Sequence, residues 1–157
     1  MRLLAVDPGH TTGLAYKRFD NRFPPEEFFI PPLTEMPVGF DECVDAIRAN
    51  IIACAPDLIV YERFQITPAT AKKTTGGSNE AIELIGVTRF LARQYAVPLE
   101  EQKPADAMSL VTDEKLKRID WYTPGKDHAR DAMRHLLLAA IRLNLVDLSL
   151  LLPRESG

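Results

Sequence analysis

The sequence predicts a single α/β domain in which helices cover both faces of a mixed five-stranded sheet. Three short strand-like runs separated by turns open the chain, which favours an antiparallel start. From residue 40 onward, segments with helical periodicity alternate with short apolar runs, a pattern typical of strands joined by helices. The chain of 157 residues has the length of one domain, and its composition of 46% hydrophobic and 26% charged residues is ordinary for a globular protein.

The first three strands are predicted from apolar runs that end at turn residues. Residues 2–6 form a short apolar run that stops at an Asp-Pro-Gly turn. Residues 14–19 resume as a second strand, and the short turn between the two runs suits an antiparallel hairpin. A third strand is expected at residues 26–30, because two prolines follow it. All three strands are therefore expected to be antiparallel to their neighbours.

The rest of the chain alternates between predicted helices and strands. Apolar side chains at three- and four-residue spacing predict a helix over residues 40–55, and the mostly apolar run at 57–62 predicts a buried strand. A helix from Ser78 or Asn79 to about Tyr95 is expected to bury Ile82, Ile85, Phe90 and Leu91. The last predicted elements are a strand at 97–101, one or two short helices within 104–118, and a long apolar helix at 127–146.

The net charge and composition of the chain exclude few classes of binding partner. The net charge is −3, yet an acidic protein can bind phosphates through a local basic surface. The sequence has no apolar run of the roughly 18–20 residues that a membrane span needs, and its first apolar run stops too early for a signal peptide. We therefore expect a cytoplasmic protein with no membrane partner. Of its three histidines, His10 and His135 are interpreted as surface or capping residues.

Three acidic residues occupy positions suited to catalysis. Asp7 ends the first strand, Glu62 ends the apolar strand, and Asp131 lies near the start of the last helix. If these two strands are neighbours, Asp7 and Glu62 emerge at one edge of the sheet. His128 and Asp131 are three residues apart and Asp127 and Asp131 are four apart, so either pair shares a helix face. Converging carboxylates need a cation, and Mg²⁺ or Mn²⁺ matches hard oxygen ligands and supports two-metal phosphodiester hydrolysis.

Each acid also has a structural interpretation. Asp7 could simply start a turn, Asp127 could cap the helix, and Asp131 could interact with the helix dipole. Glu62 is harder to explain in this way, because a carboxylate that finishes an apolar strand needs a partner. The arrangement of three acids, and no single one of them, carries the prediction.

Three motifs together resemble the RuvC family of Holliday junction resolvases. They are Asp-Pro-Gly-x-x-x-Gly from Asp7, Ile-Val-Tyr-Glu ending at Glu62, and His-Ala-Arg-Asp-Ala from His128. The resemblance extends over residues 2–145 in order and interval. It implies an RNase H-like fold, a homodimer, two divalent ions per active site, and symmetric nicking of opposed strands at a four-way DNA junction.

By the same resemblance, the metal ligands and catalytic residues are Asp7, Glu62, His128 and Asp131. Asp127 is an alternative to His128, if the helix begins a residue earlier. A histidine is a softer ligand than an aspartate, so Mn²⁺ is expected to serve at least as well as Mg²⁺.

Basic and aromatic residues near these acids are predicted to contact DNA. The polar loop after the fourth strand could bind phosphates, and the sequence has no base-reading motif. Phe64 could wedge against bases at the branch point or pack into the core. The candidates for DNA contact are Phe64, Lys72, Lys73, Lys126, Arg130 and Arg134.

Three other functions compete with junction cleavage. Another RNase H-like nuclease would carry the same acids but cut RNA–DNA hybrids, ribosomal RNA precursors or flaps. An actin-like ATPase also has an Asp-x-Gly turn after its first strand, but it needs two lobes around the nucleotide. Because 157 residues form only one, no nucleotide cofactor is expected. The third alternative is a non-catalytic DNA-binding module.

Overall fold

A mixed sheet forms the centre of the computed structural model, which describes residues 1–19, 33–36, 39–64 and 77–152. Its five strands have the order β3-β2-β1-β4-β5. β1 is antiparallel to β2 and parallel to β4, while β2 and β3 are antiparallel and β4 and β5 parallel. The strands are β1 (Arg2–Asp7), β2 (Thr12–Arg18), β3 (Leu33–Met36), β4 (Leu58–Glu62) and β5 (Leu99–Gln102).

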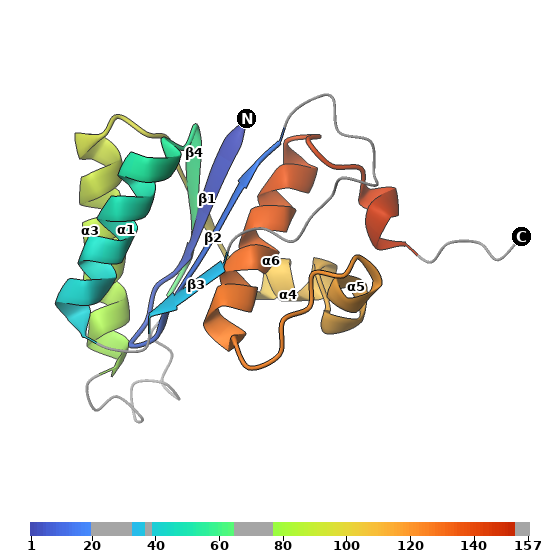
Figure 1. Ribbon diagram of the computed structural model, residues 1–157, viewed down its shortest axis with the longest axis horizontal. Helices are drawn as coiled ribbons and strands as arrows, with labels where there is room; N and C mark the ends of the chain where they lie inside the picture. The colour runs from blue at the N-terminus through green and yellow to red at the C-terminus, as the bar shows by residue number, and fades with distance from the viewer. Residues whose placement is uncertain (20–32, 37–38, 65–76, 153–157) are drawn as a thin grey trace, which may run out of the picture.

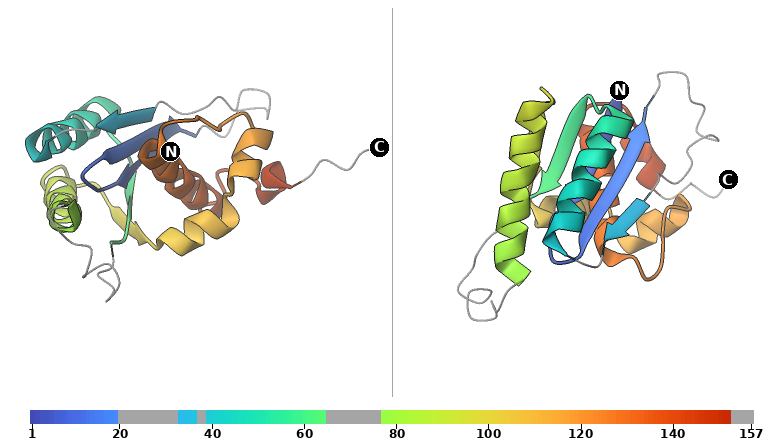
Figure 2. Two further views of the ribbon diagram at one scale, coloured as in Figure 1. Left: turned by 90° about the horizontal axis from the view of Figure 1, so that it is seen from below. Right: turned by 60° about the vertical axis from the view of Figure 1, so that its left-hand side comes forward.

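Helices cover both faces of this sheet, as the sequence predicted (Figure 1). One face carries α1 (Phe40–Cys54) and α3 (Gly77–Gln94), which lie side by side (Figure 2). The other face carries α6 (Asp127–Arg142), with α4 (Pro104–Leu110) and α5 (Asp113–Arg118) beside it. A short 3-10 helix, η2 (Leu148–Leu151), follows α6. Within the described part of the chain, no helix has both the length and the apolar character to cross a membrane.

Strand β1 contributes to two separate cores. Because successive side chains of a strand point to opposite faces, Leu3 and Ala5 pack in the core beneath α6, whereas Leu4 and Val6 pack in the core beneath α1 and α3. All four are fully buried. Burial on both faces explains why the first run of the sequence is continuously apolar instead of alternating.

The third strand differs from the prediction. Residues 26–30 lie outside the described residues, and the strand that pairs with β2 is β3, which begins at Leu33, after the two prolines. Strand-forming residues indicate an extended segment, but which segment joins the sheet depends on the partner strand and its register. The sequence did not predict the strand at residues 33–36, and the strand that it predicted at 26–30 falls in a part of the chain that the structure does not describe.

The buried side of α3 also differs from the prediction. Leu91 is buried and Ile85 packs partly buried against the core, as predicted, but Ile82 is 42% exposed and Phe90 is 65% exposed. Apolar residues occur around much of this helix, so periodicity alone could not distinguish the buried face from a second apolar face. As a result, α3 carries two large exposed apolar side chains, Ile82 and Phe90.

Candidate active site

Two parallel strands bring Asp7 and Glu62 to the same edge of the sheet. The register pairs Val6 with Tyr61, so the next residue of each strand is one of these acids. Both strands end where α6 begins, at the lower end of the molecule in Figure 1. The two strands are thus neighbours, which is the condition that the sequence argument set for bringing Asp7 and Glu62 together.

The first turn of α6 packs against β2 at Gly13. A Cβ atom at Gly13 would overlap the backbone carbonyl of His128, so only glycine allows this approach. The contact brings Nδ1 of His128 to 2.9 Å from Oδ2 of Asp7. Nearby, the hydroxyl of Thr12 donates a 2.9 Å hydrogen bond to the carbonyl of Gly9 and closes the turn after β1.

Asp7 is only 6% exposed, and the environment of its carboxyl group disfavours the ionised form. Burial raises the pKa of Asp7 to about 6, against the opposing hydrogen bond from His128. The negative charges of Glu62 and Asp131 raise it further. Burial also raises the pKa of Asp131, where the cation of Arg134 opposes it. The three acids therefore act on one another electrostatically, as expected of carboxylates that share a site.

Glu62 binds a buried histidine that the sequence did not suggest. Its Oε2 lies 2.8 Å from Nε2 of His135, and Nδ1 of that ring lies 2.9 Å from Oε1 of Gln102. His135 is 1% exposed, so its interpretation as a surface or capping residue is wrong. One signal was available: His135 is four residues after Asp131, on the same face of the last helix.

Arg134 binds carboxylates within the protein. Its guanidinium contacts Asp131 and Asp113 and donates a 3.1 Å hydrogen bond to the carbonyl of Val111. The residue is 7% exposed. These contacts do not favour the predicted DNA contact, because binding a phosphate would require breaking a buried network.

Arg130 is buried in a similar way. It binds Asp127, donates a 2.9 Å hydrogen bond to the carbonyl of Thr123, and lies 5.0 Å from the centre of the Tyr122 ring. Asp127 is exposed and directed to this arginine, whereas His128 contacts Asp7. The geometry therefore favours His128 over Asp127 as the group that joins the acids. Asp127 is also not the N-cap, because that position belongs to Lys126.

The remaining candidates for DNA contact differ in accessibility. Lys126 is exposed at the start of α6, and Phe64 is half-buried just beyond β4. Lys72 and Lys73 lie outside the described residues.

Comparison with known proteins gives a fold. No protein-family model matches the chain, and no curated protein matches it by sequence. Among solved structures, Thermus thermophilus RuvC matches with a TM-score of 0.70 and 13% identity, over 92% of this chain and 96% of that one. The fowlpox virus Holliday junction resolvase matches with a TM-score of 0.59 and 14% identity, over 91% of this chain and 99% of that one.

A third resolvase, yeast mitochondrial Ydc2, matches with a TM-score of 0.55 and 11% identity, over 95% of this chain and 79% of that one. The chain shares the fold of these three proteins. The resemblance to the RuvC family, which three short motifs predicted, is confirmed at this level. At such identities the likeness establishes the fold, and the activity is a separate question.

In this structure, the acids at the edge of the sheet do not converge into a complete set of metal ligands. Among the described residues, no three His, Cys, Asp or Glu side chains converge closely enough to hold a metal ion. Asp7, Glu62 and Asp131 each bind their own partner instead: His128, His135 and Arg134. The donors nevertheless fit a hard divalent cation, because they are carboxylate oxygens that would be stabilised by positive charge, and the negative charge of Glu62 raises the pKa of both Asp7 and Asp131.

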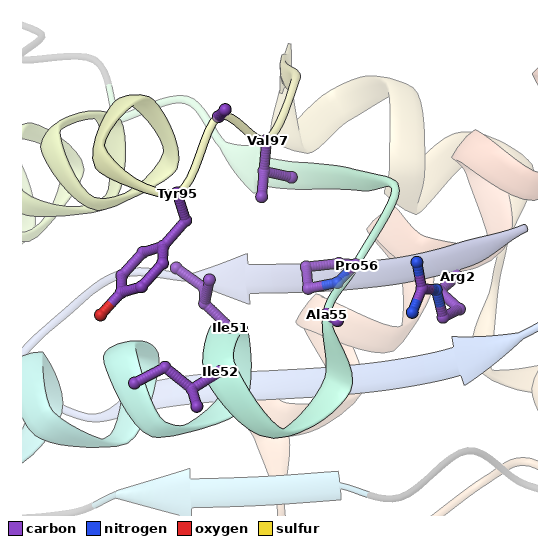
Figure 3. A pocket seen from close by; sticks show the side chains of 8 residues that line it. Arg2, Ile51, Ile52, Ala55, Pro56, Tyr95 and Val97 are labelled. Carbon is purple, nitrogen blue, oxygen red and sulfur yellow. The ribbon is translucent and has the colours of Figure 1, made fainter.

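A shallow hollow of about 400 Å³ lies at the other end of the sheet, far from the acids (Figure 3). Apolar side chains from the last turn of α1 and from the segment after α3 line it, together with Arg2. The guanidinium of Arg2 is bound to Asp57 at 2.7 Å. The hollow thus offers no unpaired charged group, and the acidic edge remains the candidate site of the resolvase fold.

Proposed function

We propose that this chain is a metal-dependent endonuclease that cuts branched DNA, resolving four-way junctions by symmetric phosphodiester hydrolysis as a homodimer. One observation carries the proposal. In a resolvase fold, the acids at the ends of β1 and β4 and at the start of α6 lie at one edge and interact electrostatically. The named neighbours include RuvC and the fowlpox virus resolvase in complex with Holliday junction DNA, which supports a branched substrate.

Asp7, Glu62, His128 and Asp131 are the proposed ligands of two divalent ions, Mg²⁺ or Mn²⁺. Such ions activate water and stabilise the leaving oxygen in phosphodiester hydrolysis. The four side chains would hold the ions at the edge of the sheet. Asp7, whose buried carboxyl resists ionisation without a cation, supplies charge that a bound ion would compensate. His128 contacts Asp7 and is the softest of the four donors, which favours Mn²⁺ as well as Mg²⁺.

For DNA contact we retain four residues and set two aside. Lys126 is exposed at the start of α6, the helix that carries His128 and Asp131, and is proposed to bind a phosphate. Phe64, directly after β4, is proposed to meet bases at the branch point. Lys72 and Lys73 stay in the proposal on sequence grounds alone. Arg130 and Arg134 are set aside as DNA contacts, because both are bound to carboxylates of the protein.

The homodimer is proposed to form through α3. Phe90 and Ile82 are large apolar side chains exposed on this helix, and exposed apolar surface can mark a protein contact. Two active sites related by a two-fold axis could nick opposed strands symmetrically.

The decisive experiment is nicking of a synthetic mobile four-way junction in Mg²⁺ and then in Mn²⁺. Wild type is compared with Asp7→Asn and Glu62→Gln, and with Asp45→Asn as a matched control, because Asp45 is exposed on α1. Linear duplex, flap and RNA–DNA hybrid serve as competitors. We expect paired symmetric nicks, reduced in both site variants by more than the roughly 10–100-fold that is typical of outer-shell changes, and unchanged in the control.

The competing functions give different results. Cleavage of flap or hybrid at a comparable rate would keep the catalytic acids but replace the substrate. Junction binding without metal-dependent cleavage of any substrate would contradict the nuclease and indicate a DNA-binding module.

A further inference from the structure

His135 is a buried titratable side chain to which the proposed reaction gives no role. It lies on α6, is 1% exposed, and connects three elements. Through Nε2 it meets Oε2 of Glu62 on β4 at 2.8 Å, and through Nδ1 it meets Oε1 of Gln102 on β5 at 2.9 Å. Gln102 is itself 1% exposed. When hydrogen-bonded side chains form a network inside an apolar core, each polar group in the network needs a hydrogen-bond partner.

We propose that His135 is a positioning residue, which holds the carboxylate of Glu62 beside Asp7 and Asp131 so that a divalent cation can bind there. This inference rests on the proposed metal-dependent function. His135 does not touch the cation or the DNA in this proposal and acts only through Glu62.

The direction of the hydrogen bonds supports this role. Nε2 of Gln102 donates to Oε1 of Glu100 at 2.9 Å, which turns the amide oxygen of Gln102 toward His135. Each ring nitrogen of His135 then faces an oxygen atom, Nδ1 that of the Gln102 amide and Nε2 that of the Glu62 carboxylate. A donor bound to a carboxylate makes a charge-assisted hydrogen bond, which is shorter and stronger than a neutral one. Gln102 thus orients the ring, and the ring orients Glu62.

This contact leaves one oxygen of Glu62 for a cation. Oε2 is bound to His135, and among the described residues Oε1 accepts no hydrogen bond. The helix adds a second constraint, because His135 lies one turn after Asp131 on the same face of α6. One helix therefore supplies a proposed ligand and also holds the ligand that comes from β4, so their separation is set by the packing of α6 against the sheet.

Two substitutions of His135 by an amide side chain distinguish a role in positioning Glu62 from a role in filling space in the core. The amide nitrogen of glutamine reaches about as far as Nε2 of histidine, so His135→Gln keeps a donor for Glu62. The amide of asparagine resembles the Nδ1 side of the ring, so His135→Asn keeps the contact with Gln102 and loses the one with Glu62. Both variants bury a neutral amide, and His10→Asn controls for the same substitution at an exposed histidine.

The experiment measures the affinity of the full chain for Mn²⁺ in the absence of DNA. The electron paramagnetic resonance signal of free Mn²⁺ reports how much of the ion is bound. Thermal unfolding of each variant tests whether it is folded. Glu62→Gln defines loss of the site. We expect His135→Asn to weaken Mn²⁺ binding about 10–100-fold and His135→Gln to weaken it less than about tenfold. His10→Asn should bind as wild type does. In nicking assays, the Mn²⁺ concentration for half-maximal rate should rise in His135→Asn, and the rate at saturating Mn²⁺ should recover.

The outcomes are distinguishable. Wild-type affinity in His135→Asn, or equal weakening in the two amide variants, would overturn the positioning role and leave the nuclease proposal intact. Absence of any Mn²⁺ binding that Glu62→Gln removes would overturn the metal site and this inference together.

A second measurement covers the case in which His135→Asn does not fold. The imidazole nitrogens of wild type, labelled with ¹⁵N in histidine only, can be followed by NMR during Mg²⁺ addition. The spectrum is simple because the chain has three histidines, and His135→Gln assigns the resonance. We expect the His135 signal to shift in wild type and to stay unchanged in Glu62→Gln. A wild-type His135 signal that does not respond to saturating Mg²⁺ would overturn the proposal.

Discussion

Asp7 is almost fully buried, and its charge has consequences for stability as well as for metal binding. Burial raises the pKa of this carboxyl from 3.8 to about 6, so the folded protein holds the proton more tightly than the unfolded chain does. Stability from this group is therefore greatest at low pH and falls as the pH rises from about 4 to about 6. Without a cation, the ionised form of Asp7 destabilises the fold at neutral pH.

Replacing Asp7 by asparagine should relieve this cost. In chelator-treated protein at pH 8, Asp7→Asn is expected to raise the free energy of unfolding by about 1–3 kcal/mol, because the asparagine oxygen still faces His128 and carries no charge. At pH 4 the gain should vanish. Urea denaturation at both pH values tests this, and a gain of equal size at pH 4 would contradict the electrostatic cause.

Loss of the Arg134 side chain is expected to lower stability, whereas loss of the Lys126 side chain is expected to weaken DNA binding. Arg134→Met leaves the partly buried carboxylates of Asp131 and Asp113 without their cation, and it should reduce the free energy of unfolding by about 1–3 kcal/mol. Lys126→Met removes an exposed charge, so it should leave stability unchanged and weaken junction binding with a smaller salt dependence. Urea denaturation and binding titrations at several salt concentrations measure both. Full stability in Arg134→Met would show that the buried network matters little.

At the scale of elements, the approach of α6 to β2 determines whether the site can form. Gly13 pairs with Asp7 across the hairpin, and its missing side chain admits the backbone of His128. A single close contact thus couples the end of β1, the start of β2 and the first turn of α6. The helix carries His128, Asp131 and His135 on one face, so its displacement would disturb all three together.

Adding one methyl group at Gly13 should therefore act on the site and on the fold. Gly13→Ala is expected to reduce the free energy of unfolding by about 1–3 kcal/mol or more, because α6 must move away from β2. It should also weaken Mn²⁺ binding by displacing His128 from Asp7. Gly86→Ala is the matched control: a Cβ there meets nothing within 4 Å, and a helix interior favours alanine by about 0.5–1 kcal/mol. Equal effects of the two changes would contradict the close-contact argument.

At the scale of the whole molecule, the two ends of the sheet differ in character. The acids gather at one end, where α6 begins, and the apolar hollow lies at the other. The exposed apolar side chains Ile82 and Phe90 belong to α3, on the face of the sheet opposite α6. Symmetric nicking requires two copies of the acidic edge, so the proposed activity and the proposed dimer depend on each other.

The dimer proposal predicts that one charge on α3 will separate the copies. Phe90→Glu is expected to convert a dimer into a folded monomer, because a charge in an apolar contact loses its hydration. Size-exclusion chromatography with light scattering measures the mass. Met108→Glu is the control, since Met108 is similarly exposed on α4, on the other face of the sheet. A wild-type monomer at high concentration would contradict the homodimer.

The sequence by itself determined the elements that local patterns govern. Apolar runs and periodicity located β1, β4, α1 and α6 to within a few residues, and turn residues marked their ends. The ends of strands also located Asp7 and Glu62, because a parallel pair brings equivalent positions to one edge. It did not locate β3, and it did not separate the buried face of α3 from its exposed one.

Only the tertiary structure decided which side chains meet. Glu62 and His135 are 73 positions apart in sequence, and Asp7 and His128 are 121 apart. Such contacts depend on strand order, on register and on the rotation of α6 about its axis, none of which a local pattern encodes. For the same reason Arg134, which the sequence suggested as a DNA contact, is bound inside the protein. The charge and spacing of residues in the sequence identify candidates for a functional site. Tertiary packing determines which side chains those residues contact.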